Sequence, residues 1–166
     1  MGKIRIYHRI TVIVTVLLYA GSLIWFLTAY KGLPEVIGIH FDPKGFDVFA
    51  EKVFGFYPFV AGPILTLVLQ LVRFLSEKLK GSHKLNETGN EKYKKLIKIY
   101  ADTFTLMIAV FFTSWNWAVI NQNAHYHSAY FYNGLMTFIP IMVIALPVFD
   151  IVYKHKYKNP EYKKRQ

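Results

Sequence analysis

The stretch ITVIVTVLLYAGSLIWFLTAY, residues 10–30, decides the fold class. It is predominantly apolar and reaches the length of about 20 residues that a helix needs to cross the hydrocarbon core of a bilayer. Similar blocks follow at about 54–75, 99–120 and 135–153. No block has a charge near its centre, where a charged side chain costs about 2.5–3.5 kcal/mol. We therefore predict an all-α membrane protein, a bundle of four transmembrane helices that forms a single integral membrane domain (residues 1–166) in contact with the lipid bilayer.

The distribution of basic residues predicts the orientation of these helices. The formal net charge is +10. Three Lys or Arg residues precede residue 10, eight lie between 73 and 98, and six follow 153, whereas segment 121–134 has none. Because cytoplasmic loops are enriched in Lys and Arg, both termini and the middle loop of this multi-pass cell-membrane protein are expected in the cytoplasm. The same segregation argues against nucleic acid as a partner and favours anionic lipid headgroups beside the basic tail.

Specific chemistry is expected in two outward loops, 31–53 and 121–134, or inside the bundle. The middle segment 76–96 is rich in Gly, Asn and Lys, and it is predicted to be a solvated, mobile connector. The chain contains no cysteine, which excludes disulfides and thiolate metal ligands.

The first outward loop is predicted to be an ordered cap. Ile37, Ile39 and Phe41 recur at every second position within residues 36–42, which predicts a short strand with one apolar face and with His40 and Asp42 on the other face. The sequence Asp-Pro-Lys-Gly at 42–45 fits a type I turn. Asp47 is predicted to cap a helix that continues toward the second apolar block.

The same loop resembles the signature Leu-Pro-x-x-Ile-Pro-x-His-(Phe/Trp)-Asn-x-x-Gly-x-x-Asp…Lys of the SdpI-related membrane family, a domain of unknown function best known from SdpI-type immunity proteins. The resemblance covers residues 33–52 and the two flanking helices, less than half of the chain. Gly38 replaces the usual proline, Asp42 replaces the usual asparagine, and the interval after the signature glycine is one residue shorter. The matching residues are Leu33, Pro34, Ile37, His40, Gly45, Asp47 and Lys52.

The resemblance implies a polytopic protein that binds or senses a toxic peptide at the outer membrane face. In the immunity proteins, which carry a further membrane module, it also implies recruitment of a cytoplasmic repressor. The expected function is therefore non-enzymatic binding or signalling, with an extracytoplasmic peptide and a cytoplasmic regulator as partners. The sequence leaves open whether the chain forms a homo-oligomer.

A metal site is the main alternative. His125 and His127 lie two apart in the second outward loop, and together with His40 and Asp42 they would offer three imidazoles and a carboxylate. These ligands suit zinc or another divalent transition metal, in a catalytic or a regulatory role. His125 and His127 also fit an interfacial pair, hydrogen-bonded to water and headgroups, within an aromatic belt that the surrounding Tyr and Trp residues form. The same histidines also fit a pH sensor.

The third apolar block carries a polar stripe with helical spacing. It consists of Asp102, Thr105, Thr113 and Asn116, with Ala109 on the same face. One interpretation is a helix–helix contact, in which each interhelical hydrogen bond contributes roughly 0.6 kcal/mol. The other is a proton or ion track in a small transporter subunit, which requires a wet interior. No other block offers an obvious ionisable partner for Asp102, and Gln70 is the nearest residue in kind.

Overall fold

The structure is a computed structural model that describes residues 2–42, 45–78, 85–121, 140–141, 143–145 and 147–158. Two strands, β1 (Val36–Asp42) and β2 (Gly45–Glu51), form an antiparallel hairpin. Short 3₁₀ turns at Tyr30–Gly32 and Lys52–Phe56 join this hairpin to the helices before and after it. Those helices and a third one make up most of the described chain: α1 (Gly2–Ala29), α2 (Tyr57–Lys78) and α3 (Glu87–Asn121).

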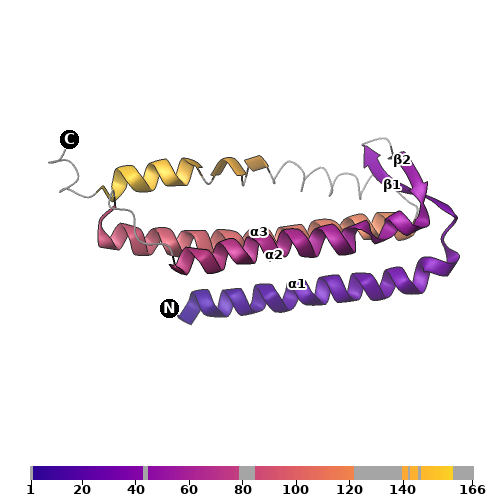
Figure 1. Cartoon of the computed structure of the whole chain (residues 1–166), viewed down its shortest axis with the longest axis horizontal. Coiled ribbons are helices and arrows are strands. Elements are labelled where there is room, and N and C mark those ends of the chain that lie inside the picture. Colours follow the sequence, from indigo (N-terminus) through magenta and orange to yellow (C-terminus); the bar gives the residue numbers. More distant parts are fainter. Residues whose placement is uncertain are drawn as a thin grey trace.

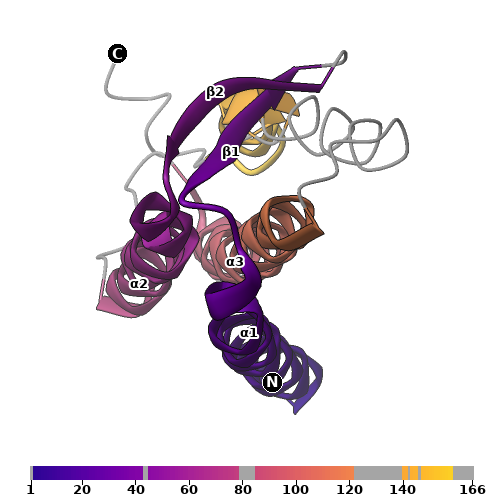
Figure 2. The ribbon, with the colours of Figure 1, turned by 90° about the vertical axis from the view of Figure 1, so that its right-hand side faces the viewer.

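The three helices run side by side along the long axis, and the hairpin lies at one end of them (Figure 1). Helix α3 packs against both α1 and α2. Figure 2, which looks onto the hairpin end, shows the two strands projecting to one side of the helix axes. We call the opposite end, where α1 begins, α2 ends and α3 begins, the basic end.

All three helices are long and apolar enough to cross a membrane. Their exposed surface is apolar, as at Leu17 and Leu67, which are 66% and 68% exposed. Their interior is unusually polar, because Thr11, Ser22 and Asn116 are all buried. This reverses the pattern of a soluble domain and is typical of helices in lipid, which associate through small and polar residues. Three of the four predicted spans are thus confirmed as helices that have the length and composition to cross a membrane.

The predicted fourth span, 135–153, is confirmed only in part. The backbone is helical at residues 140–141, 143–145 and 147–156, and the rest of the predicted span lies outside the described residues. The end of this segment packs against the start of α3. Tyr93 Oη donates a hydrogen bond to Asp150 Oδ1 over 3.0 Å, and the Asn86 N–H donates to the Tyr157 carbonyl over 3.0 Å. The four-helix bundle therefore stays a prediction.

A hydrophobic cluster fixes the hairpin to the helix ends. Phe26, Leu33, Ile37 and Val119 are all buried and pack together. The ring of Phe26 also meets the ring of Phe56 edge-on, with 4.8 Å between centroids. Strand alternation explains the role of β1, because Ile37 is fully buried while Val36 is 56% exposed. The predicted strand is confirmed over residues 36–42, and its buried apolar face is confirmed at Ile37.

The prediction that Asp47 caps a helix is wrong. Asp47 lies inside β2, and helix α2 begins only at Tyr57. The reason is the turn before it: Asp42 pairs with Gly45, whose φ of 138° is a conformation that glycine reaches without strain. The chain therefore reverses tightly and returns as a second strand, which the β-prone residues Phe46, Val48 and Phe49 favour.

The prediction of a mobile connector over 76–96 is wrong for most of that segment. Helix α2 continues to Lys78, and α3 begins at Glu87. Asn86 stabilises this start, because its Oδ1 accepts a hydrogen bond from the Gly89 N–H over 2.7 Å. Such a side-chain bond satisfies one of the free donors in the first helical turn. Residues 79–84 lie outside the described part.

Candidate functional site

The hairpin places His40 and Asp47 against each other. His40 Nδ1 lies 2.6 Å from Asp47 Oδ1, and both side chains are about half exposed. The pair joins one residue of each strand, whereas the sequence pattern had grouped His40 with Asp42. The backbone of Asp42 ends β1, and its side chain lies outside the described atoms. An exposed imidazole–carboxylate pair of this kind can bind a polar ligand through hydrogen bonds.

An irregularity in the hairpin sets this geometry. The register has shifts on either side of His40, and neither Ile39 nor Asp47 has a Cα partner on the opposite strand. Extra residues of this kind bend a strand and redirect its side chains. The Ile39 carbonyl accepts a hydrogen bond from Trp115 Nε1 of α3 over 2.8 Å. The irregularity thus anchors the cap to α3 on one side and presents the His40–Asp47 pair on the other.

The remaining signature residues divide into structural and exposed positions. Leu33 is buried in the cluster below the hairpin, while Pro34 is exposed. Lys52 closes the base of the hairpin: its N–H donates to the Glu35 carbonyl over 2.9 Å, and its Nζ donates to Glu35 Oε1 over 2.8 Å. Most of these side chains therefore build the cap, and His40 and Asp47 are the pair that it displays.

The structure also accounts for one departure from the signature. Gly38 stands where the signature has proline, and a Cβ atom built on Gly38 would overlap the ring of Phe46. Phe46 itself packs toward Ala118 of α3, next to Trp115. Glycine at position 38 therefore gives the Phe46 ring the room that it needs.

The described residues contain no cluster of side chains that supports the metal hypothesis. Within them, no group of three or more His, Asp or Glu side chains is placed to hold a metal ion. His125, His127 and residues 122–134 as a whole lie outside the described part, so the predicted contact between the two outward loops is not addressed. The zinc site stays a prediction.

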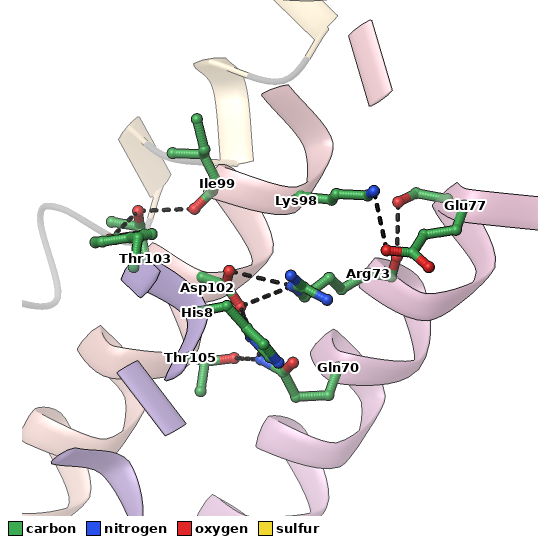
Figure 3. Close-up of polar contacts among 11 residues, drawn as sticks. His8, Gln70, Arg73, Glu77, Lys98, Ile99, Asp102, Thr103 and Thr105 are labelled. Carbon is green, nitrogen blue, oxygen red and sulfur yellow. Dashed lines mark hydrogen bonds and ion pairs between the residues drawn. The ribbon is translucent and has the colours of Figure 1, made fainter. Parts of the chain in front are cut away.

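A second polar site lies at the basic end, around Asp102 (Figure 3). Asp102 is fully buried and receives partners from both neighbouring helices. Arg73 of α2 donates its Nε–H to the carboxylate over 3.1 Å, and His8 Nδ1 of α1 lies 2.8 Å from Oδ1. The expectation that no other helix supplies an ionisable partner is therefore wrong. The carboxylate links α1, α2 and α3 through one group of hydrogen bonds, of which the bond from Arg73 is charge-assisted.

The rest of the polar stripe also makes contacts between helices. Thr105 Oγ1 accepts a hydrogen bond from Gln70 Nε2 of α2 over 2.9 Å. Asn116 Nδ2 donates to Ser22 Oγ of α1 over 2.8 Å and to the Ser22 carbonyl over 3.1 Å. Two buried oxygens, Thr113 Oγ1 and Asn116 Oδ1, have no hydrogen-bond partner among the described residues. This geometry is the one that the helix-contact interpretation requires, and the transporter role stays a prediction.

The positions of His8 and Arg73 relative to the apolar blocks could have indicated that they are partners of Asp102. Residue spacing within α3 alone could not. His8 precedes the first apolar block by two residues, and Arg73 lies near the end of the second. In the predicted topology both residues fall at the same membrane edge as Asp102. His8, Arg73 and Asp102 therefore have a similar depth in the predicted membrane, although they lie on three different helices.

Comparison with protein-family models, with curated proteins and with solved structures returns no match for this chain.

Proposed function

We propose that the chain is a non-enzymatic membrane protein that binds a membrane-active peptide on the extracytoplasmic side through the hairpin. The observation that carries this proposal is the construction of the hairpin as a fixed cap: the Trp115–Ile39 hydrogen bond and the buried Ile37 hold it to the helix ends. A connection that served only to join two helices would need neither contact. Binding surfaces are commonly placed on loops that a rigid scaffold holds.

The exposed side chains of the hairpin indicate the class of ligand. Val36 and Phe49 lie on the strand face opposite to the buried Ile37, and they are 56% and 60% exposed. Glu51 is paired in register with Val36 and is also exposed, while Asp47 is 42% exposed. Apolar side chains beside carboxylates suit a peptide with both apolar and basic residues.

The resemblance of residues 33–52 to the SdpI-type signature supports the same role. In that family the signature belongs to proteins that bind or sense toxic peptides. We therefore propose an immunity-like or signalling role, in which occupation of the hairpin end is passed on to a cytoplasmic regulator. The Asp102 group supports this transmission, because it connects all three helices at the far end.

A survival assay tests the proposal. Bacterial cells that produce the chain are challenged with a panel of cationic, membrane-active toxin peptides, and survival is compared with that of cells carrying an empty vector. We expect protection against at least one peptide, and we expect Phe49→Ala combined with Glu51→Gln to abolish it. Both side chains are exposed, so this variant should fold normally.

The matched control is Leu67→Ala, which removes an apolar side chain that is 68% exposed, compared with 60% for Phe49, from the middle of α2. Protein amounts in the membrane fraction are compared for all three chains. The proposal is contradicted if no peptide is resisted, or if the hairpin variant protects as well as the Leu67→Ala control.

A further inference from the structure

A cavity of about 500 Å³ opens between the helices at the basic end. This volume lies within the range of roughly 300–1,000 Å³ that is typical of small-molecule sites. Cationic side chains dominate the lining, with only two carboxylates among them. The lining residues are Ile4, Arg5, His8, Arg73, Glu77, Glu91, Lys94, Lys95 and Lys98.

Part of this positive charge is left without a partner. Lys98 Nζ pairs with Glu77 Oε1 over 2.9 Å, so these two groups offset each other. No ion pair within the described residues involves Arg5, Lys94 or Lys95. Like charges that face one cavity repel each other, and a bound anion removes this repulsion. The cavity therefore favours an anionic ligand.

Arg73 supplies the geometry for recognising that anion. Its side chain is only 14% exposed, and its Nε–H is bonded to Asp102. An arginine has five N–H donors, and the four on the terminal nitrogens have no hydrogen-bond partner among the described residues. A guanidinium with both terminal nitrogens available binds phosphate through two parallel hydrogen bonds.

Asp102 and His8 hold this arginine in place. Asp102 is fully buried behind the cavity wall, and its carboxylate fixes the Nε edge of the guanidinium. His8 lines the cavity and contacts the same carboxylate from the side of α1. The arginine is thus oriented before any ligand arrives, which lowers the entropy cost of binding.

The position of the cavity along the helices favours a ligand from the membrane surface. Helix α3 has 35 residues, about 50 Å at 1.5 Å per residue, whereas the hydrocarbon core is about 30 Å thick. The charged residues of α3 end at Lys98, apart from Asp102, and the apolar block of α1 starts at residue 10. The lining residues therefore lie where the charged part of each helix meets its apolar part, at the depth of lipid headgroups.

From these contacts we propose that the cavity at the basic end is a binding site for a phosphate group. The group comes from the headgroup of an anionic phospholipid or from a soluble phosphate. Arg73 binds the phosphate oxygens through its terminal nitrogens, and Lys94, Lys95 and Arg5 neutralise its charge. This site is distinct from the hairpin and does not depend on the peptide-binding proposal.

Two probes test the site on the full chain purified in a neutral detergent. Native mass spectrometry measures lipid retained from an equal mixture of phosphatidylglycerol and phosphatidylcholine, and isothermal titration calorimetry measures binding of inorganic phosphate. The test variant is Lys94→Ala/Lys95→Ala, which breaks no ion pair in the described residues. The control is Lys78→Ala/Lys156→Ala, which removes the same charge from the same end without altering the cavity lining.

Preferential retention of phosphatidylglycerol that falls at least tenfold in the test variant, and not in the control, identifies the lipid headgroup as the ligand. Saturable binding of inorganic phosphate with the same pattern, without a lipid preference, identifies a soluble phosphate. The proposal is overturned if neither probe binds. It is also overturned if both double variants weaken binding equally, since that result shows a diffuse surface charge.

Discussion

Arg73 on α2 lies with its Nε 3.1 Å from the carboxylate of Asp102 on α3, and the carboxylate is fully buried between the helices. His8 of α1 contacts the same carboxylate over 2.8 Å. One acidic side chain therefore joins three helices at the end opposite to the hairpin. A buried charge with charged partners is costly to disturb from one side only, because the remaining charge cannot return to water.

Substitution of Asp102 should destabilise the bundle strongly. We expect Asp102→Leu to lower the free energy of unfolding by about 3 kcal/mol, since it leaves the Arg73 guanidinium, whose side chain is only 14% exposed, without its ion-pair partner. The double variant Asp102→Leu/Arg73→Met should recover most of this loss. Equilibrium unfolding in mixed micelles, with an increasing fraction of a denaturing detergent, measures the free energy of unfolding of both variants.

Asp150→Asn is the matched control for this experiment. Asp150 pairs with Lys154 one turn away at a partly exposed position, and an asparagine there keeps an oxygen that can accept the Tyr93 hydrogen bond. Its substitution should change the free energy of unfolding by less than about 1 kcal/mol. An equal loss in the Asp102 and Asp150 variants would show that the buried group has no special role.

The hydrogen bond from Trp115 to the hairpin should control the order of the cap. Trp115→Phe keeps an aromatic ring but removes the Nε1–H donor to the Ile39 carbonyl. We expect a loss of about 1 kcal/mol and faster hydrogen exchange of the hairpin amides. Trp117→Phe is the control, since that ring is 42% exposed and makes no such bond in the described residues. Unchanged exchange in the Trp115 variant would contradict the anchoring role.

The close contact at Gly38 predicts a specific loss and a specific rescue. Gly38→Ala places a methyl group in the space of the Phe46 ring, so we expect weaker folding of the hairpin. Phe46→Leu should restore part of the loss in the double variant. Gly32→Ala, where a Cβ atom would meet nothing within 4 Å, should be harmless. The midpoint of thermal unfolding is compared for the unmodified chain, the two single glycine variants and the double variant. An equal decrease of this midpoint for Gly38→Ala and Gly32→Ala would disprove the close contact at Gly38.

Metal content separates the binding hypothesis from the metal hypothesis. Elemental mass spectrometry on untagged protein, purified without chelator, should find no stoichiometric zinc or other transition metal. We expect the same result for His40→Ala and for His125→Ala/His127→Ala. Near-stoichiometric metal that disappears in either variant would instead support the alternative built from His40, Asp42, His125 and His127.

Length and hydropathy were sufficient to predict the helical scaffold. Three of the four apolar blocks form helices at the expected places, with α1 and α3 extending farther at their charged ends than the apolar blocks do. Alternation around Ile37 predicted the first strand, because burial on one face leaves a period of two in the sequence. The second strand was missed, since Asp47 after a turn is also the pattern of a helix cap.

The partners of Asp102 were missed for a different reason. Contacts between helices depend on how each helix is rotated and shifted relative to its neighbours, and a hydropathy pattern fixes neither property. The polar stripe predicted which face of α3 is buried, and the burial of Asp102, Thr105 and Asn116 confirms it. It contained no information on whether His8 or Arg73 would meet that face. The pairing of His40 with Asp47 was hidden in the same way by the irregular register of the hairpin.

The most direct test of the peptide-binding proposal is the side of the membrane on which the hairpin lies. The chain has no cysteine, so a single cysteine at Phe49 or at Glu87 reports its own position without background. A membrane-impermeant maleimide applied to intact cells should label Phe49→Cys, whereas Glu87→Cys at the basic end should react only after lysis. Labelling of Glu87→Cys but not of Phe49→Cys in intact cells would place the hairpin in the cytoplasm and contradict an extracytoplasmic binding site.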